Sequence, residues 1–253
     1  YHDLVLSQWP KRKETKLTDF PFIHAIRTRL GRGLPEFFGI PPPAAAPPCQ
    51  ACNNPIQKAV PEHFTSCTTT HQATHRSVVR EVYQCARAAG VREIEMERPF
   101  TDNQTGNQHR IDIWLKDPSP ENPLQPYYMV DPTIIQSYNA NDPTIVPKTK
   151  NMLKQAYQRK MQTYANTALA NNATVVPLAF TSFGSYHFGV PNFLKHMQQI
   201  AIRTGNHFPD TDGSFVHQWS TTISFTIARA VARNASEAAR KHRENNTVPN
   251  NAT

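Results

Sequence analysis

The spacing of apolar residues predicts a group of strands in the middle of the chain with helices around it. Apolar residues recur at helical intervals from Thr74 to Ala89, and Gly90 follows as a helix stop. Residues 91–97 alternate roughly between polar and apolar, and residues 110–115 alternate regularly, as strands do. Residues 127–130 are apolar throughout, which indicates a buried central strand.

The second half of the chain continues this mixture of helices and strands. After a loop over residues 136–147, the pattern predicts a helix over about 149–170 and a buried strand over 175–180. Pro191 starts a further helix, and Asp212-Gly213-Ser214 caps a final one. The order of elements predicts an α/β domain with a mixed sheet flanked by helices.

Two aspartates on predicted strands are the main candidates for chemistry. Apolar residues take every second position from Ile111 to Leu115 and line one face, so Asp112 projects from the other. Asp131 ends the buried strand, where an ionised carboxylate is costly unless it is paired or bound to metal. The alternative for Asp131 is a strand-end residue that starts a turn before Pro132.

A lysine accompanies the two acids. Ala156, Lys160 and Tyr164 recur every four residues and so share one face of the predicted helix. Two carboxylates on neighbouring strands, with a lysine alongside, can hold a divalent metal against a phosphodiester and activate a water. We therefore interpret the chain as a metal-dependent nuclease, with Lys148 or Lys150 as alternative positions for the lysine.

Other polar residues are secondary candidates. Glu97 and the backbone carbonyl after Asp131 are possible further ligands of Mg²⁺, and Glu81 either faces solvent or supplies a third carboxylate. His75 and Arg76 open the first predicted helix, where a phosphate could be gripped by a cation and the helix N-terminus together. Arg110, on the first acid-bearing strand, is a further candidate for contact with nucleic acid.

A cluster of cysteines precedes these elements. The spacing Cys49-x2-Cys52-x10-His63-x3-Cys67 predicts a tetrahedral Zn²⁺ site, in which the metal would supply most of the folding energy. The alternative is three unligated thiols near a surface histidine. Such a knuckle either contacts nucleic acid or serves only as a structural clip.

The net charge and the lack of long apolar segments limit the classes of partner and cellular location that we expect for the chain. The chain has 253 residues with a formal net charge of +8, which favours a polyanionic partner. It has no apolar run of about 20 residues, so we expect no membrane span. The opening has no apolar h-region, so we expect no signal peptide, and the missing initiator Met suggests a piece of a longer polypeptide or a processed chain.

Composition shifts divide the chain into five predicted segments. Residues 1–40 are a basic helical linker from an upstream region, and 41–48 are a stiff Pro/Ala spacer. Residues 49–70 form the zinc knuckle, 71–245 the nuclease domain, and 246–253 a disordered tail.

Taken together, these motifs resemble the C-terminal region of site-specific non-LTR retrotransposon polyproteins that carry a restriction-like endonuclease. The resemblance covers roughly residues 49–190, and its motifs follow the family's order. They are the knuckle, Thr74-His75-Arg76, the glutamates Glu93, Glu95 and Glu97 before Arg98-Pro99-Phe100, Arg110-Ile111-Asp112, Met129-Val130-Asp131, Ala156–Lys160–Tyr164, and Val176-Pro177-Leu178 through Gly184.

The resemblance implies a fold, a site and a role. It implies a PD-(D/E)xK restriction-endonuclease-like domain with Asp112, Asp131 and Lys160 as catalytic residues, Mg²⁺ or Mn²⁺ at the acids and Zn²⁺ at the knuckle. Tyr164 would pack or contact a phosphate. The product would be a nick whose 3′-hydroxyl primes reverse transcription in the nucleus, with double-stranded target DNA and the element's RNA as partners. An inactive nucleic-acid-binding module and a cellular resolvase or repair nuclease are the alternatives.

Overall fold

The computed structural model describes residues 68–101, 106, 108–118, 120, 123–135, 145–206 and 214–246. The predictions for the linker, the spacer, the zinc ligands Cys49, Cys52, His63 and Cys67, and residues 247–253 lie outside this part. The elements in order are α4 (Thr68–Ala88), β1 (Ile94–Thr101), β2 (Gln108–Lys116), β3 (Tyr127–Ile135), α5 (Ile145–Ala170), β4 (Ala173–Thr181), α6 (Gly189–Arg203) and α7 (Phe215–Asn246).

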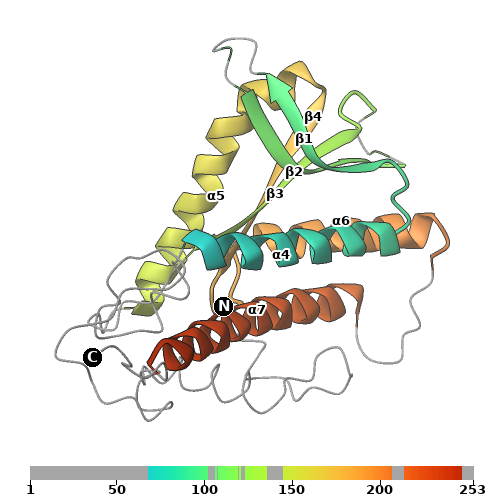
Figure 1. Cartoon of the computed structure of the whole chain (residues 1–253). Helices are drawn as coiled ribbons and strands as arrows, with labels where there is room; N and C mark the ends of the chain where they lie inside the picture. Colours follow the sequence, from blue (N-terminus) through green and yellow to red (C-terminus); the bar gives the residue numbers. More distant parts are fainter. Residues whose placement is uncertain are drawn as a thin grey trace, which may run out of the picture.

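The strands form one mixed sheet in the order β1-β2-β3-β4 (Figure 1). β1 and β2 are antiparallel, as are β2 and β3, whereas β3 and β4 are parallel. Helix α5 provides the crossover that a parallel pair requires. The prediction of an α/β fold with a mixed sheet flanked by helices is confirmed.

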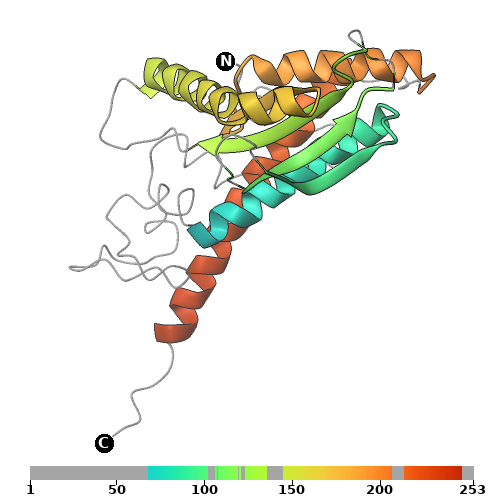
Figure 2. The same ribbon diagram turned by 90° about the horizontal axis from the view of Figure 1, so that it is seen from above.

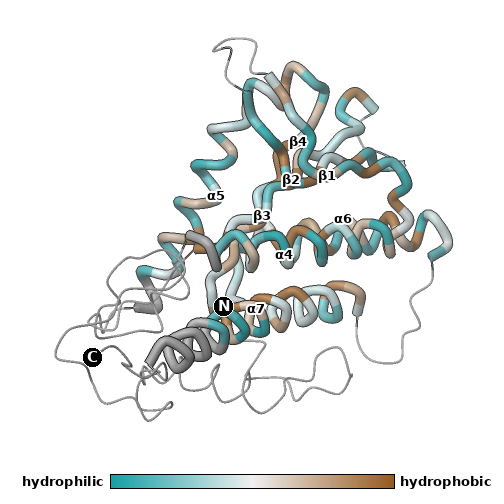
Figure 3. The backbone as a smooth tube through the Cα atoms, in the orientation of Figure 1, coloured by the Kyte–Doolittle hydropathy of each residue, from teal (hydrophilic) through white to brown (hydrophobic). Residues whose placement is uncertain are grey.

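Helices cover both faces of the sheet. Buried side chains of α4, α6 and α7 pack with Ile113, Leu115 and Leu178 in the larger core cluster. Tyr164 and Ala168 of α5 pack on the opposite cluster. In Figures 1 and 2, α7 runs along the side of α4 and α6 that faces away from the sheet. Figure 3 shows hydrophobic segments within the sheet, and hydrophobic residues that alternate with hydrophilic ones along α4, α6 and α7.

Helix α4 ends as its sequence predicts but begins earlier. Gly90 adopts a φ of +93°, its N–H donates to the Arg87 carbonyl, and the N–H of Val91 donates to the Ala86 carbonyl. These two bonds form a Schellman motif, in which glycine takes the left-handed position without strain. The helix starts at Thr68, so His75 lies two turns inside it. The prediction that His75 and Arg76 open the helix is wrong.

The β1–β2 hairpin is twisted beside Asp112. Glu97 has a φ of +57°, and the ladder passes from Met96↔Ile113 to Arg98↔Ile111 without a pair at Glu97 and Asp112. As a result Ile111 packs in the cluster of α5, whereas Ile113 and Leu115 pack in the other. The prediction that all three line one face is therefore wrong for Ile111.

Strand β3 also continues beyond its predicted end. It runs through Asp131 and Pro132 to Ile135, so Asp131 lies within the strand and does not start a turn. Proline is tolerated there because pairing with β2 stops at Val130, and the Pro132 carbonyl faces that open side, where His75 contacts it. Since N–H and C=O of one strand residue point the same way, the missing N–H removes no bond to β4.

The remaining helices follow the sequence closely. α5 begins at Ile145, inside the segment predicted as a loop, and α6 begins at Gly189, just before Pro191. The N–H of His217 donates to the Ser214 hydroxyl at 3.3 Å, which confirms the cap of α7. Cys85 is fully buried in the core. Among the described helices, none combines the length and apolar character needed to cross a membrane.

Candidate active site

The two candidate aspartates lie close enough to affect each other's charge where β2 and β3 separate. The last pair of the antiparallel ladder is Ile113↔Val130, and the next position in the same register would be Asp112 opposite Asp131. The strands part at this step, so both carboxylates lie at the fork. We call this place the strand fork, made of Asp112, Asp131 and Pro132.

Asp131 is held by groups from α5 and from its own strand. Its side chain is 3% exposed, and the Lys160 ammonium donates to its Oδ2 at 2.8 Å. The Tyr164 hydroxyl also hydrogen-bonds this carboxylate. Thr133 Oγ1 lies 3.4 Å from Oδ1. Ala156, the first member of the helical pattern, packs against Leu153 and Ala179 and so brings α5 close to β4.

Asp112 is held from the other side by α4. The Nε2 atom of His75 lies 3.2 Å from Asp112 Oδ2 and 2.9 Å from the carbonyl oxygen of Pro132. One turn earlier, His71 Nε2 lies 3.1 Å from the Ile134 carbonyl. The two histidines therefore contact successive outward carbonyls of β3 along the edge that β2 leaves open.

The electrostatics at the fork reflect burial and the closeness of the acids. Burial raises the pKa of Asp131, and the carboxylate of Asp112 adds to this, while Lys160 opposes it. The hydrogen bond to Asp112 raises the pKa of His75 above its ordinary value, against the effect of burial. Burial and the neighbouring Asp131 raise the pKa of Tyr164, which keeps its phenol protonated as a donor.

The donor atoms at the fork suit a hard divalent ion in part. The Asp112 carboxylate and the Pro132 carbonyl are oxygen donors of the kind that Mg²⁺ and Mn²⁺ take. Within the described residues, however, no group of three or more His, Cys, Asp and Glu side chains is arranged to hold a metal. An ion here would depend on the main-chain carbonyl and on waters.

Several predicted residues lie away from this set. The Glu97 carboxylate is 56% exposed and lies 3.5 Å from Arg110, itself 68% exposed. Glu81 faces α7, where it bonds Thr226 and lies near Arg229, so it neither faces open solvent nor joins the acids. Arg76 is exposed. The alternative lysines, Lys148 and Lys150, are also exposed, and it is Lys160 that contacts Asp131.

One contribution to the site was missed by sequence reasoning, namely the link from His75 to Asp112. The backbone carbonyl after Asp131 was expected as a possible contributor, and the Pro132 carbonyl lies 2.9 Å from His75 Nε2. The spacing of His71 and His75, four residues apart on one helix face, was the available signal. It did not reveal which strand the two imidazoles would meet.

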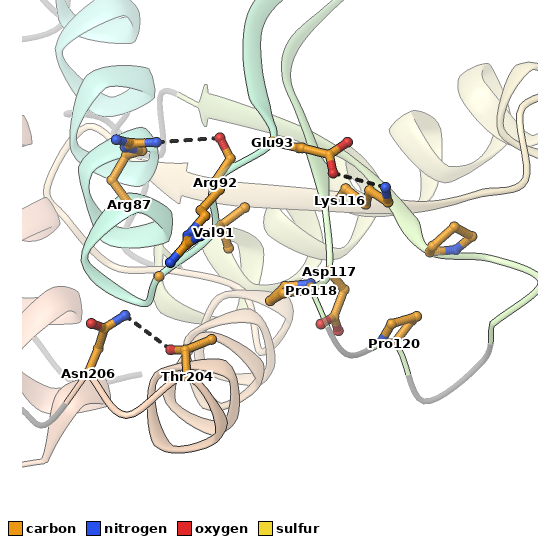
Figure 4. A pocket seen from close by; sticks show the side chains of 12 residues that line it. Arg87, Val91, Arg92, Glu93, Lys116, Asp117, Pro118, Pro120, Thr204 and Asn206 are labelled. Carbon is orange, nitrogen blue, oxygen red and sulfur yellow. Dashed lines mark hydrogen bonds and ion pairs between the residues drawn. The ribbon is translucent and has the colours of Figure 1, made fainter.

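A separate cavity of about 760 Å³ lies at the opposite end of α4 (Figure 4). It is lined by Arg87, Arg92 and Lys116 together with Asp117, and Lys116 donates to Glu93 at 2.9 Å. The cavity shares no lining residue with the strand fork, and the C-terminal ends of α4 and α6 meet there. Helix C-termini carry partial negative charge, so the arginines are suited to stabilising the fold.

No protein-family model matches the chain, and no curated protein matches it significantly.

Proposed function

We propose that this protein is a metal-dependent endonuclease of the restriction-like, PD-(D/E)xK type. The observation that carries the proposal is the contact of Lys160 with Asp131 at 2.8 Å, beside Asp112 at the strand fork. Three residues from β2, β3 and α5 thus supply two carboxylates and one ammonium at one place. That set is suited to phosphodiester cleavage.

Each residue has a distinct part in the proposed reaction. Asp112 and the Pro132 carbonyl would hold Mg²⁺ or Mn²⁺. Asp131, on the neighbouring strand, would add its negative charge beside the ion and hold Lys160 in place. A bound divalent ion supplies Lewis-acid chemistry, polarising a phosphate and lowering the pKa of a water. The Lys160 side chain is 24% exposed, so its ammonium would reach a phosphate while staying bonded to Asp131 and would offset the charge that grows on the transition state.

The substrate and the wider role follow from charge and from the resemblance of the motifs. The net charge of +8 suits a nucleic-acid backbone, and the resemblance points to double-stranded target DNA. We propose that the chain nicks this DNA in the nucleus and leaves a 3′-hydroxyl that primes reverse transcription by a polymerase encoded upstream. Zn²⁺ at Cys49, Cys52, His63 and Cys67, and the element's RNA as a partner, belong to the same proposal.

The test is plasmid nicking by the full chain with Mg²⁺ or Mn²⁺. Asp112→Ala, Asp131→Ala and Lys160→Ala should each reduce nicking by at least about a hundredfold, because each removes part of the charge arrangement. Glu95→Gln is the control, since Glu95 is 60% exposed and pairs only with Arg98 among its described contacts. EDTA should abolish cleavage by the unaltered chain.

A second candidate is a nucleic-acid-binding module without catalysis. The absence of a three-side-chain metal group among the described residues favours it. The two candidates differ in one outcome: a binding module retains DNA affinity and shows no metal-dependent nicking. Cleavage that survives both aspartate substitutions would contradict the assignment of the site itself.

A further inference from the structure

We infer that His75 is a direct ligand of the divalent ion, through Nε2, and that it makes the site prefer Mn²⁺ to Mg²⁺. This inference rests on the proposed function. It adds an imidazole from α4 to the oxygen donors of β2 and β3 and so completes a set of three protein donors. Two of these donors are side chains, those of His75 and Asp112. The third is the main-chain oxygen of Pro132.

The spacing of the donors supports coordination. His75 Nε2 lies 2.9 Å from the Pro132 oxygen and 3.2 Å from Asp112 Oδ2. An octahedral ion with bonds of about 2.0–2.1 Å places neighbouring ligands about 2.9 Å apart. Both contacts of His75 therefore have the length of an edge of such an octahedron. In the absence of an ion, the same nitrogen donates a hydrogen bond to the two oxygens.

The imidazole is held in place by its helix. Thr74, the preceding residue, is buried and accepts a hydrogen bond from Asn234 of α7 at 3.1 Å. Val78, one turn further on, is fully buried in the core. This packing determines where the Cα of His75 lies, and α4 cannot slide without breaking both contacts.

The site is open to an ion on the side of Asp112. The side chains of His75 and Asp112 are 27% and 22% exposed, whereas Asp131 is almost completely buried beneath Lys160. The Lys160 ammonium contacts Asp131, whereas Asp112 is contacted by His75. An ion can therefore approach the three donors without displacing the lysine.

The chemistry of imidazole determines the expected preference. Mg²⁺ takes oxygen ligands almost exclusively, whereas Mn²⁺, a transition-metal ion of similar coordination geometry, accepts an imidazole nitrogen beside its oxygen ligands. His71 offers a matched control because it lies on the same helix face and contacts a β3 carbonyl at 3.1 Å, but its described contacts include no carboxylate.

The experiment measures ion binding without turnover. Isothermal titration of the full chain with MnCl₂ and with MgCl₂ is compared for the unaltered protein, His75→Ala, His71→Ala and Asp112→Asn. We expect His75→Ala to weaken Mn²⁺ binding by about tenfold or more, to change Mg²⁺ binding by less than about threefold, and His71→Ala to change neither. Asp112→Asn should weaken both.

Pulsed electron paramagnetic resonance of the Mn²⁺-loaded chain provides a direct signature. A directly bound imidazole gives a ¹⁴N coupling, which should persist in His71→Ala and disappear in His75→Ala. His75→Gln, which keeps a hydrogen-bond donor for the two oxygens, should also lose the coupling. The glutamine variant replaces His75→Ala in these measurements if circular dichroism shows that the alanine variant does not fold.

The outcomes separate this inference from the proposed function. If the ¹⁴N coupling is absent from the unaltered chain, or if His75→Ala binds Mn²⁺ as well or better, His75 is not a ligand. The endonuclease proposal survives that result when Asp112→Asn still loses ion binding and nicking. If the unaltered chain binds neither ion, both are overturned.

Discussion

At the scale of single residues, Asp131 shows how a buried charge is tolerated. Its side chain is only 3% exposed, but the carboxylate accepts hydrogen bonds from the Lys160 ammonium and the Tyr164 hydroxyl. An ionised acid without these donors would be too costly to bury. The two α5 residues lie one helical turn apart, so a single face of one helix supplies both donors.

This arrangement predicts the effect of removing one hydroxyl. Tyr164→Phe should lower the free energy of unfolding by about 1–3 kcal/mol, because it leaves a buried carboxylate with one donor fewer. Denaturant unfolding followed by circular dichroism measures the change. Tyr157→Phe is the control, since the Tyr157 ring packs against the rings of His187 and Phe188, and phenylalanine keeps these contacts. Equal losses in the two variants would contradict a specific role for the Tyr164 hydroxyl.

At the scale of elements, the types of helix and strand were predictable because their periods are local. The strands over 110–115 and 127–130 and the helix carrying Lys160 were all predicted from spacing alone. The strand fork was not, because it depends on where β2 stops pairing with β3. That point lies beside Pro132 of β3 and near Glu97 of β1, which has a positive φ, so it involves residues distant in sequence.

The candidate site was accordingly predicted in part. Asp112, Asp131 and Lys160 could be proposed because acids within apolar strands are unusual. The link from His75 to Asp112 could not, since it arises from α4 lying against an edge that opens only in the folded sheet. Glu97 was proposed as a ligand from its position, but its strained backbone leaves its carboxylate beside Arg110.

The start of α6 predicts a dependence of stability on pH. The N–H of Gly189 donates to Nδ1 of His187 at 3.2 Å, so this imidazole must be neutral at Nδ1, and burial lowers its pKa below the ordinary 6.5. Between the lowered pKa and 6.5 the unfolded chain binds more protons than the folded one. The stability that His187 contributes is therefore present above pH 6.5 and is lost as the pH falls through the folded-state pKa.

His187→Asn should reduce this loss because asparagine offers an acceptor that does not titrate. Denaturant unfolding at pH 7.5 and at pH 5.5, for both proteins, measures it. The unaltered chain should lose more stability between the two pH values, by at most about 1.4 kcal/mol per pH unit. Parallel losses would show that His187 does not titrate in this range.

At the scale of the whole molecule, the net positive charge favours binding of a polyanion, whereas the acidic strand fork favours binding of a cation. The chain carries a net charge of +8, while the fork concentrates two aspartates on the edge of β2 and β3. A basic body attracts a polyanion from a distance, and the acids act only where a cation joins them. Binding and cleavage should therefore be separable.

The affinity for duplex DNA should fall linearly with salt on a log–log plot, with a slope of about −0.9 for each phosphate neutralised. Fluorescence anisotropy of a labelled duplex, in EDTA and at several salt concentrations, measures this slope. Asp131→Asn should keep the slope while losing nicking, because it removes no cation. An affinity independent of salt would argue against a nucleic-acid partner.

The contact of α4 with the open edge of β3 has a consequence for solubility. His71 and His75 occupy two carbonyls that would otherwise be free to accept another strand. Exposed strand edges promote association between chains. Helix α4 thus covers a strand edge that could otherwise pair with another chain, in addition to supporting the acids.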